Sequence, residues 1–359
     1  MTKITRKKSG RHAMNGLLCS WPQSKNRLKP LLFRATKNGG ITLAIGSLIL
    51  MSIGIVATGF STAPLNLYIA TIIMSVGFHY LETMLQSMQL LWLKKAEAPI
   101  IMGKVISVKN FGMTITFVLV YLFFQVFTIS YQLAYVIFGG IGVVLAMLAI
   151  YGFQKFADDK AQHKKIILKK RYWLFYLLTF LAGARRQIFV VFAGFLLVEK
   201  FGFKVQDIAL LHFVNALVSI YFAQKIGKLI ARIGERLSLI LEYLGLIILF
   251  CAYGLVQSGE LAVALYIIDH ILFAMAIAIR TYFQKIADSE DLTSSAGVSF
   301  TINHIAAVLL PAALGLVWIN NYSLVFFIGA GIAGLSLLAS LLIPKNPDSV
   351  NYLVRFNRA

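Results

Sequence analysis

Two adjacent arginines, Arg185 and Arg186, stand in the middle of the apolar run LTFLAGARRQIFVVFAGFLLV, residues 178–198. A charged side chain at the centre of a bilayer costs roughly 2.5–3.5 kcal/mol on insertion scales, so it marks an ion pair or a functional site. Neighbouring residues on a helix point about 100° apart, so one arginine can face a cavity while the other meets a neighbouring helix. A structural salt bridge and binding of an anionic substrate both remain open for this pair.

A second polar group follows one stripe of the segment SVGFHYLETMLQSMQL. His79, Glu82, Gln86 and Gln89 share one face of the predicted helix. Four polar groups on an otherwise apolar span suggest a wet or polar interior, and a hydrogen-bonded packing seam is the alternative. Glu82 is the strongest candidate of the four, because a buried carboxyl group can carry a proton.

A third group lies in the segment LYIIDHILFAMAIAIR. Asp269 and His270 stand near its middle, and Asp269 is the expected counter-ion of Arg185 or Arg186. His270 can titrate in the physiological range, although a hydrogen bond inside the bundle is the commoner role. Weaker candidates, for which we expect interhelical hydrogen bonds more than ligand contacts, are His212, Asn215, Asn303 and His304.

The elements that must position these side chains are membrane-spanning helices. Of 359 residues, 59% are hydrophobic and 13% are charged, and the mean hydropathy is +0.79, whereas about a quarter of the residues in soluble domains are charged. We therefore predict an all-α polytopic membrane protein. About ten spans are expected, with the approximate limits 41–61, 65–93, 104–127, 131–153, 172–198, 206–226, 237–257, 261–285, 296–319 and 322–343.

Basic residues between the spans account for the formal net charge of +20. Basic loops alternate with loops that carry little or no charge, so the positive-inside rule places both termini in the cytoplasm and disfavours nucleic acid as a partner. The N-terminal segment 1–40 carries ten Lys or Arg and no acidic residue, which indicates a tail lying on anionic lipid and not a cleaved secretory leader. Cys19 and Cys251 provide neither a disulfide framework nor a metal-binding spacing, and we expect no metal and no cofactor. Glu242 and Lys109 fall near predicted inner span ends and are expected at the interface.

The longest basic loop between spans, 154–171, divides the chain unequally. Four spans precede it in 41–153 and six follow it in 172–343, with a short cytoplasmic tail at 344–359. Two bundles joined by a cytoplasmic linker are typical of transporters built from two repeats.

A short motif, GKLIARIGER, lies between the sixth and seventh predicted spans. Its glycines and arginines stand at Gly227, Arg232, Gly234 and Arg236. The motif resembles the cytoplasmic loop G-x-x-x-D-R-x-G-R-[RK] of the major facilitator superfamily, with Ala231 in place of the aspartate and Glu235 in place of the first late arginine. Glycines permit a tight turn, and arginines can bind carboxylates and helix C-termini in one access state.

The resemblance covers about residues 41–345 at the level of topology and implies a helix numbering. If the six later spans are the family's helices 7–12, the four earlier ones are helices 3–6, and the chain resembles a facilitator shortened by helices 1 and 2. The three polar groups then fall on helices 4, 7 and 10, which line the family's central cavity, where the arginines would meet water. The resemblance implies a multi-pass transporter of the cell membrane that works by alternating access.

We expect such a transporter to carry a small solute, anionic or amphipathic by preference, with protons as the coupling ion. Glu82 and Asp269 are the expected proton carriers, and no phosphate-binding loop for ATP is present in the sequence. Three alternatives remain: a ten-span membrane enzyme such as an acyltransferase using span histidines as bases, a transporter of two five-span repeats, and a shortened facilitator that is inactive or needs a partner. We favour a transporter over an enzyme, because no histidine lies beside an acidic or nucleophilic loop group.

Overall fold

The computed structural model describes residues 39–127, 129–152 and 168–347. Within these ranges the chain is helical, and ten helical segments are long and apolar enough to cross a membrane, which confirms the expected all-α class and the number of spans. Helices are required here, because a lipid interior offers the backbone no hydrogen-bond partner outside the chain.

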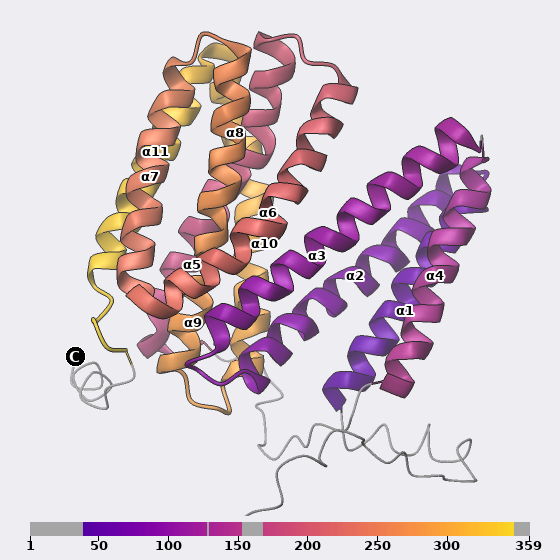
Figure 1. The fold of residues 1–359 in the computed structure, drawn as a ribbon, viewed down its shortest axis with the longest axis horizontal. Coiled ribbons are helices and arrows are strands. Elements are labelled where there is room, and N and C mark those ends of the chain that lie inside the picture. Colours follow the sequence, from indigo (N-terminus) through magenta and orange to yellow (C-terminus); the bar gives the residue numbers. More distant parts are fainter. Residues whose placement is uncertain (1–38, 128, 153–167, 348–359) are drawn as a thin grey trace, which may run out of the picture.

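The helices form a four-helix bundle followed by a six-span bundle (Figure 1). The first bundle consists of α1 (Gly39–Gly59), α2 (Pro64–Trp92), α3 (Ala98–Tyr121) and α4 (Tyr131–Gly152). The second consists of α5 (Trp173–Gln187), α6 (Val205–Ile233), α7 (Glu235–Leu255), α8 (Gly259–Phe273), α9 (Ile277–Ile286), α10 (Leu292–Asn320) and α11 (Tyr322–Leu341). Beyond Gln187 the fifth span continues in π-helical turns at Ile188–Ala193 and Leu196–Lys200.

Two spans differ from their predicted form. The helix predicted over 261–285 is interrupted at Ala274–Ala276 by a short 3₁₀ turn, so α8 and α9 are separate helices of one span. The sixth span, α6, continues to Ile233, well beyond the predicted end at 226. Hydropathy marks where apolar residues stop, and a helix can continue past that point with basic residues in its last turns.

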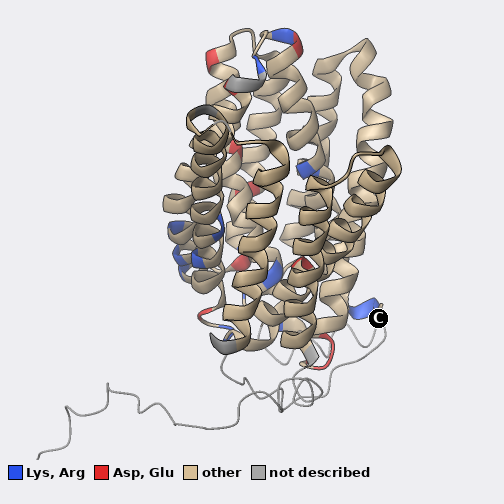
Figure 2. Cartoon of the chain, turned by 90° about the vertical axis from the view of Figure 1, so that its right-hand side faces the viewer, with Lys and Arg blue, Asp and Glu red and all other residues tan. Residues whose placement is uncertain are grey.

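The start of α1, the end of α4, the start of α5 and the end of α11 lie at one end of the molecule, here called the linker end (Figure 1). The two bundles approach one another there, and their ribbons diverge toward the opposite, far end. Charged residues gather toward the two ends, and a few lie within the helices (Figure 2).

Helix α3 crosses α6 at very short range in the linker half. A Cβ on Gly103 would stand 2.4 Å from the carbonyl oxygen of Ala223, and one on Gly227 would stand 2.4 Å from that of Pro99. Ser107 Oγ donates a hydrogen bond to the carbonyl oxygen of Ile220 at 2.7 Å. Small residues let helix backbones approach closely inside a membrane, so this crossing joins the two bundles.

The ends of α2 and α9 are joined by hydrogen bonds from side chains. Gln284 Nε2 donates to the carbonyl oxygens of Leu90 at 2.8 Å and Leu93 at 2.6 Å. Lys95 Nζ donates in turn to the carbonyl oxygen of Lys285 at 2.9 Å. The last carbonyls of a helix have no partner within it, so these side chains satisfy both helix ends and close the linker end.

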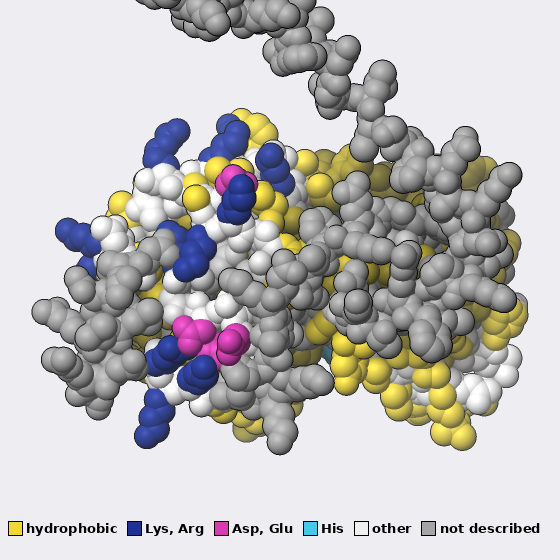
Figure 3. Space-filling model, turned by 90° about the horizontal axis from the view of Figure 1, so that it is seen from below, with side chains coloured by type: hydrophobic (Ala, Val, Ile, Leu, Met, Phe, Trp, Pro, Cys, Tyr) yellow, Lys and Arg dark blue, Asp and Glu magenta, His cyan; other side chains and the backbone are white. Residues whose placement is uncertain are grey.

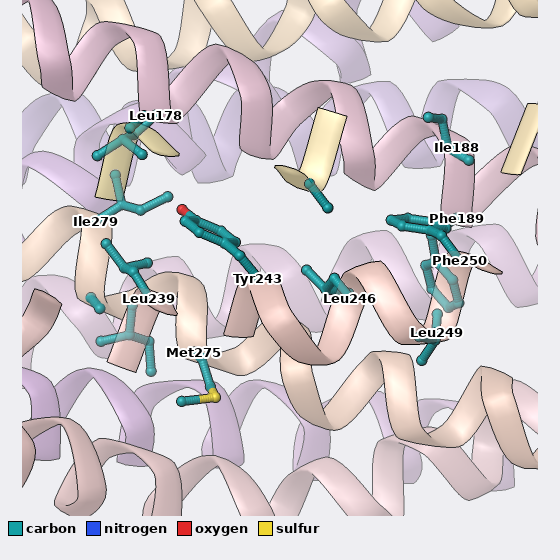
Figure 4. Packing of buried hydrophobic residues seen from close by; sticks show 14 of the residues in the cluster. Leu178, Ile188, Phe189, Leu239, Tyr243, Leu246, Leu249, Phe250, Met275 and Ile279 are labelled. Carbon is teal, nitrogen blue, oxygen red and sulfur yellow. The ribbon is translucent and has the colours of Figure 1, made fainter. Parts of the chain in front are cut away.

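The main hydrophobic core belongs to the six-span bundle. Figure 4 shows Tyr243 of α7 pointing toward Leu178 of α5 and Ile279 of α9, and Phe250, farther along α7, lying beside Phe189. Each of these side chains is at most 5% exposed. Candidate site residues carried by α5, α7 and α8 are therefore held by a packed core.

Candidate functional site

Arg185 lies within the core of the six-span bundle. Its buried neighbours along α5 and the π-helical turn that follows recur at three- and four-residue intervals, with Leu178, Leu181 and Ile188 among them. Its Nη1 and Nη2 atoms each lie 3.3 Å from Oε1 of Glu242 on α7, and the two side chains are 3% and 0% exposed. This is a buried ion pair, which needs good geometry to offset desolvation.

Aromatic and acidic groups complete the surroundings of this pair. The Arg185 guanidinium carbon lies 4.7 Å from the centre of the Tyr243 ring, within cation–π range. Asp269 of α8 is 2% exposed and close enough to interact electrostatically with both Arg185 and Glu242. Among the described residues, Asp269 Oδ2 and Glu242 Oε2 have no hydrogen-bond partner. The cluster thus holds two carboxyl groups and one guanidinium.

The ion-pair partner of Arg185 differs from the one predicted from the sequence. Asp269 was the expected counter-ion, and Glu242 was expected at the membrane interface, yet Glu242 forms the ion pair. Glu242 stands about two turns inside α7, on the buried stripe that contains Leu239, Tyr243 and Leu246. That stripe was readable from the sequence and was the signal for a buried carboxylate.

Arg186 is not part of this cluster. It is exposed, and its guanidinium carbon lies 5.6 Å from the centre of the Phe273 ring. In the part of the chain that the structure describes, no carboxylate is placed within ion-pair distance of Arg186. The expectation that both arginines face water is therefore wrong for Arg185. Of the two, Arg186 is the arginine whose charge is available to a ligand.

The polar stripe of α2 faces α3 of its own bundle and α10 of the six-span bundle. Glu82 Oε2 is 3.6 Å from Lys109 Nζ, and Glu82 Oε1 accepts a long hydrogen bond of 3.5 Å from Gln86 Nε2. The His79 ring packs edge-on against the His304 ring at a centroid distance of 4.8 Å. No three His, Cys, Asp or Glu side chains within the described ranges are placed to hold a metal ion.

The weaker candidates make contacts mainly within the protein. Asn215 Nδ2 lies 3.4 Å from His270 Nδ1, which joins α6 to α8. Asn303 donates to the carbonyl oxygen of Ser299 at 3.0 Å, and His304 Nδ1 lies 2.9 Å from that of Phe300, so both bond to their own helix. The His212 ring is exposed and packs on Tyr266, at a centroid distance of 6.0 Å.

The motif between α6 and α7 is almost entirely helical. Gly227 belongs to the α3 crossing, and only Gly234, with φ of +82°, interrupts the helices. Glu235 replaces an arginine of the family motif and pairs with Lys285 of α9, with its two carboxylate oxygens 2.9 and 3.0 Å from Nζ. Arg232 is exposed and Arg236 is half-buried, and neither forms an ion pair with another described residue.

A second ion-pair network at the linker end was not predicted from sequence. The Asp291 carboxylate lies 2.7 Å from Lys169 Nζ, 3.0 Å from Arg171 Nη2 and 2.7 Å from the Tyr172 hydroxyl. Burial alone would raise the pKa of Asp291, but hydrogen bonds from Lys169, Tyr172 and Arg171 outweigh it and hold that pKa below its ordinary value. Seen from this end, Lys and Arg side chains spread over the face of the six-span bundle, with a few acidic side chains among them (Figure 3).

The model of the Major Facilitator Superfamily matches residues 35–311. The chain belongs to the major facilitator superfamily. Among curated proteins none matches the sequence significantly. The match identifies a transporter family and disfavours both the two five-span repeats and the membrane acyltransferase.

Solved structures of major facilitator transporters have the same fold. FucP, in the outward conformation, shares 13% identity with a TM-score of 0.69, covering 88% of this chain and 86% of its own. A human organic anion transporter shares 12% identity with a TM-score of 0.68, covering 86% and 81%. A bacterial homologue of the iron transporter ferroportin, in the outward-facing state, shares 11% with a TM-score of 0.64, covering 87% and 86%. At these identities the likeness shows the fold alone.

Proposed function

We propose that this protein is a proton-coupled secondary transporter of a small solute, working by alternating access in the cell membrane. The observation that carries the proposal is the buried cluster of Arg185, Glu242 and Asp269. Two carboxyl groups share one guanidinium inside a membrane bundle. An uncompensated buried charge is costly, so one proton held between Glu242 and Asp269 would balance the cluster. Release of that proton in the other access state would couple transport to the proton gradient.

Arg186 is the proposed contact for the solute. It lies beside the cluster on α5 and is exposed, with no carboxylate partner among the described residues. A free guanidinium at this depth favours an anionic group, because it can form two parallel hydrogen bonds with a carboxylate or phosphate. Glu82, on α2, remains a further candidate proton carrier through its contacts with Lys109 and Gln86.

From the contacts at the linker end we infer which access state of the proposed cycle this structure represents. The α3–α6 crossing and the Gln284 hydrogen bonds hold the two bundles together there. With both termini in the cytoplasm, this arrangement is closed to the cytoplasm, in line with the outward states named for FucP and the ferroportin homologue. The exposed Arg232 and half-buried Arg236 would find their carboxylate partners in the opposite state.

Reconstitution in liposomes tests the proposal. Purified protein is given an inward proton gradient and a panel of small organic anions, and an internal pH dye reports proton entry. We expect one or more anions to drive proton entry in the wild type. Glu242→Gln and Asp269→Asn should abolish gradient-driven accumulation while preserving exchange of labelled for unlabelled solute. Glu260→Gln, an exposed carboxylate at the far end, is the matched control and should behave as wild type.

Two results would contradict the proposal. Accumulation that persists in both cluster variants would show that these carboxyl groups carry no coupling proton. Unchanged exchange in Arg186→Gln would show that this arginine does not contact the solute.

A further inference from the structure

A cavity of about 480 Å³ lies between α6 and α8 near the far end, apart from the buried charge cluster. Its walls include Leu211 and Val214 of α6 and Val263 and Ile267 of α8, and the segment that contains Phe203 borders it. Its volume falls within the range of about 300–1,000 Å³ that is usual for small-molecule sites. A cavity with such walls favours an apolar group of a ligand.

The one charged side chain in the cavity wall, Asp207, already has a hydrogen-bond partner. Asp207 Oδ2 accepts a hydrogen bond of 2.8 Å from the backbone N–H of Lys204, which caps the start of α6. The carboxylate therefore serves the helix start. A cationic ligand would have to compete with this cap, which leaves an apolar body as the fitting occupant.

Helix α8 runs from this cavity to the surroundings of Arg186. Val263, Ile267 and His270 recur at four- and three-residue intervals and share one stripe of the helix, and Phe273 follows His270 by about one turn, roughly 60° further round. The first two line the cavity, and Phe273 lies against the Arg186 guanidinium at 5.6 Å. From Ile267 to Phe273 the helix rises about 9 Å, at about 1.5 Å per residue.

A polar contact between α6 and α8 follows the cavity along both helices. Asn215 follows the lining residue Val214, and its Nδ2 lies 3.4 Å from Nδ1 of His270, which lies between Ile267 and Phe273 along α8. His270 also lies within electrostatic range of Arg186. An apolar space, a polar side-chain pair and a guanidinium with no carboxylate partner among the described residues thus follow one another beside α8.

We propose that this arrangement binds an amphipathic monoanion, with its apolar body in the α6–α8 cavity and its acidic group at Arg186. The proposal deepens the transport function and rests on it, since it names the solute class of that site. The positive charge of Arg186 requires an acidic group at one end of the ligand. The apolar walls and the volume of the cavity require an apolar group at the other end. A phospholipid acyl chain is the competing occupant, and the test separates the two.

Binding is measured with the full-length protein in phosphatidylcholine nanodiscs. The probes are straight-chain carboxylates from hexanoate to dodecanoate and the alcohols of equal length, with empty nanodiscs as the correction for partition into lipid. Burial of each methylene gives about 0.8 kcal/mol, so affinity should rise roughly fourfold per methylene until the cavity is full. Each carboxylate should bind at least tenfold more tightly than its alcohol.

Three variants test which part of the site binds each end of the ligand. Val214→Trp and Ile267→Trp fill the cavity from opposite walls and should remove the dependence on chain length while leaving hexanoate binding in place. Arg186→Gln should remove the preference for the carboxylate. Leu217→Trp is the matched control, because that side chain is on the same helix, 45% exposed and outside the cavity.

Affinity that does not rise with chain length, or rises equally in Val214→Trp and Leu217→Trp, would overturn the inference. So would a phospholipid that native mass spectrometry finds on the wild type and not on Val214→Trp, with no Arg186-dependent carboxylate binding. Binding as expected without proton-coupled flux in liposomes would reject the proposed function and leave this site standing. Proton-coupled flux of anions with no chain-length dependence would reject the site alone.

Discussion

Replacing Arg185 by glutamine should destabilise the protein more than replacing Glu242 by glutamine, although both changes break the same ion pair. Without Arg185, Glu242 and Asp269 are two buried carboxyl groups with no cation in the cluster. Without Glu242, Arg185 still has Asp269 within electrostatic range. Removing one partner of a buried ion pair costs about 3–5 kcal/mol. We expect Arg185→Gln to lower the free energy of unfolding by an amount in that range. Glu242→Gln should lower it by about 1–3 kcal/mol, the cost of an unsatisfied buried donor.

The double variant Arg185→Gln/Glu242→Gln should cost less than the sum of the two single changes. Only Asp269 then remains, and it can be neutralised by one proton, so we expect a coupling energy of about 0.5–3 kcal/mol. Unfolding is followed in mixed micelles by a thiol-reactive dye at Cys251, a half-buried residue of α7, in a background where Cys19 is replaced by serine. The control pair is Glu235 and Lys285, which is more exposed at the linker end.

Equal losses in the two single variants would refute the view that Asp269 takes part in the cluster. Strict additivity in the double variant would refute the ion pair itself. A loss below 1 kcal/mol for Arg185→Gln would mean that water or a shift of α5 supplies a charge partner.

Three further predictions concern the linker end. Gly103→Ala and Gly227→Ala should each cost about 1–3 kcal/mol in the same unfolding assay, because a Cβ at either site would stand 2.4 Å from a backbone oxygen of the other helix, whereas Gly112→Ala, with nothing within 4 Å, should be neutral or slightly stabilising. Gln284→Ala removes two hydrogen bonds to α2 and should shift the bundles toward separation at the linker end by about 1–3 kcal/mol, seen as a longer spin-label distance between α2 and α9. Asp291→Asn should be less stable than wild type at pH 6, and the difference should begin to shrink as pH falls below about 4 and vanish only below the lowered pKa of the folded state, because a carboxyl group whose folded pKa is lowered stabilises only where it is ionised.

The helical class and the ten spans could be predicted because each depends on local sequence alone. An apolar run of about twenty residues in lipid can satisfy its backbone only as a helix, whatever surrounds it. The end of α6 was misplaced for the same reason. Hydropathy records the apolar part of a helix, and the turns that lead to Ile233 are amphipathic and basic.

The partner of Arg185 depends on which helices adjoin α5, and a single sequence gives no such information. Periodicity puts Arg185, Glu242 and Asp269 each on a buried stripe, but it does not measure the distances between stripes. The 3₁₀ turn at Ala274–Ala276 is another such case, because no glycine or proline in that segment marks the interruption. Hydrogen bonds such as Gln284 to Leu90 join residues almost two hundred positions apart and likewise follow from the assembled fold.

The opposite environments of Arg185 and Arg186 provide a physical route for coupling in the proposed transporter. The charge of Arg185 is engaged by Glu242 in a fully buried pair, so it is not available to a solute, whereas Arg186 is exposed and has no such partner among the described residues. Since the two arginines are neighbours on one helix, a solute whose binding to Arg186 shifts α5 would also displace Arg185. That displacement would change how well one guanidinium neutralises two carboxyl groups, and the retention of the proton proposed between them would depend on this balance. Solute binding and proton release would then be linked through α5 alone.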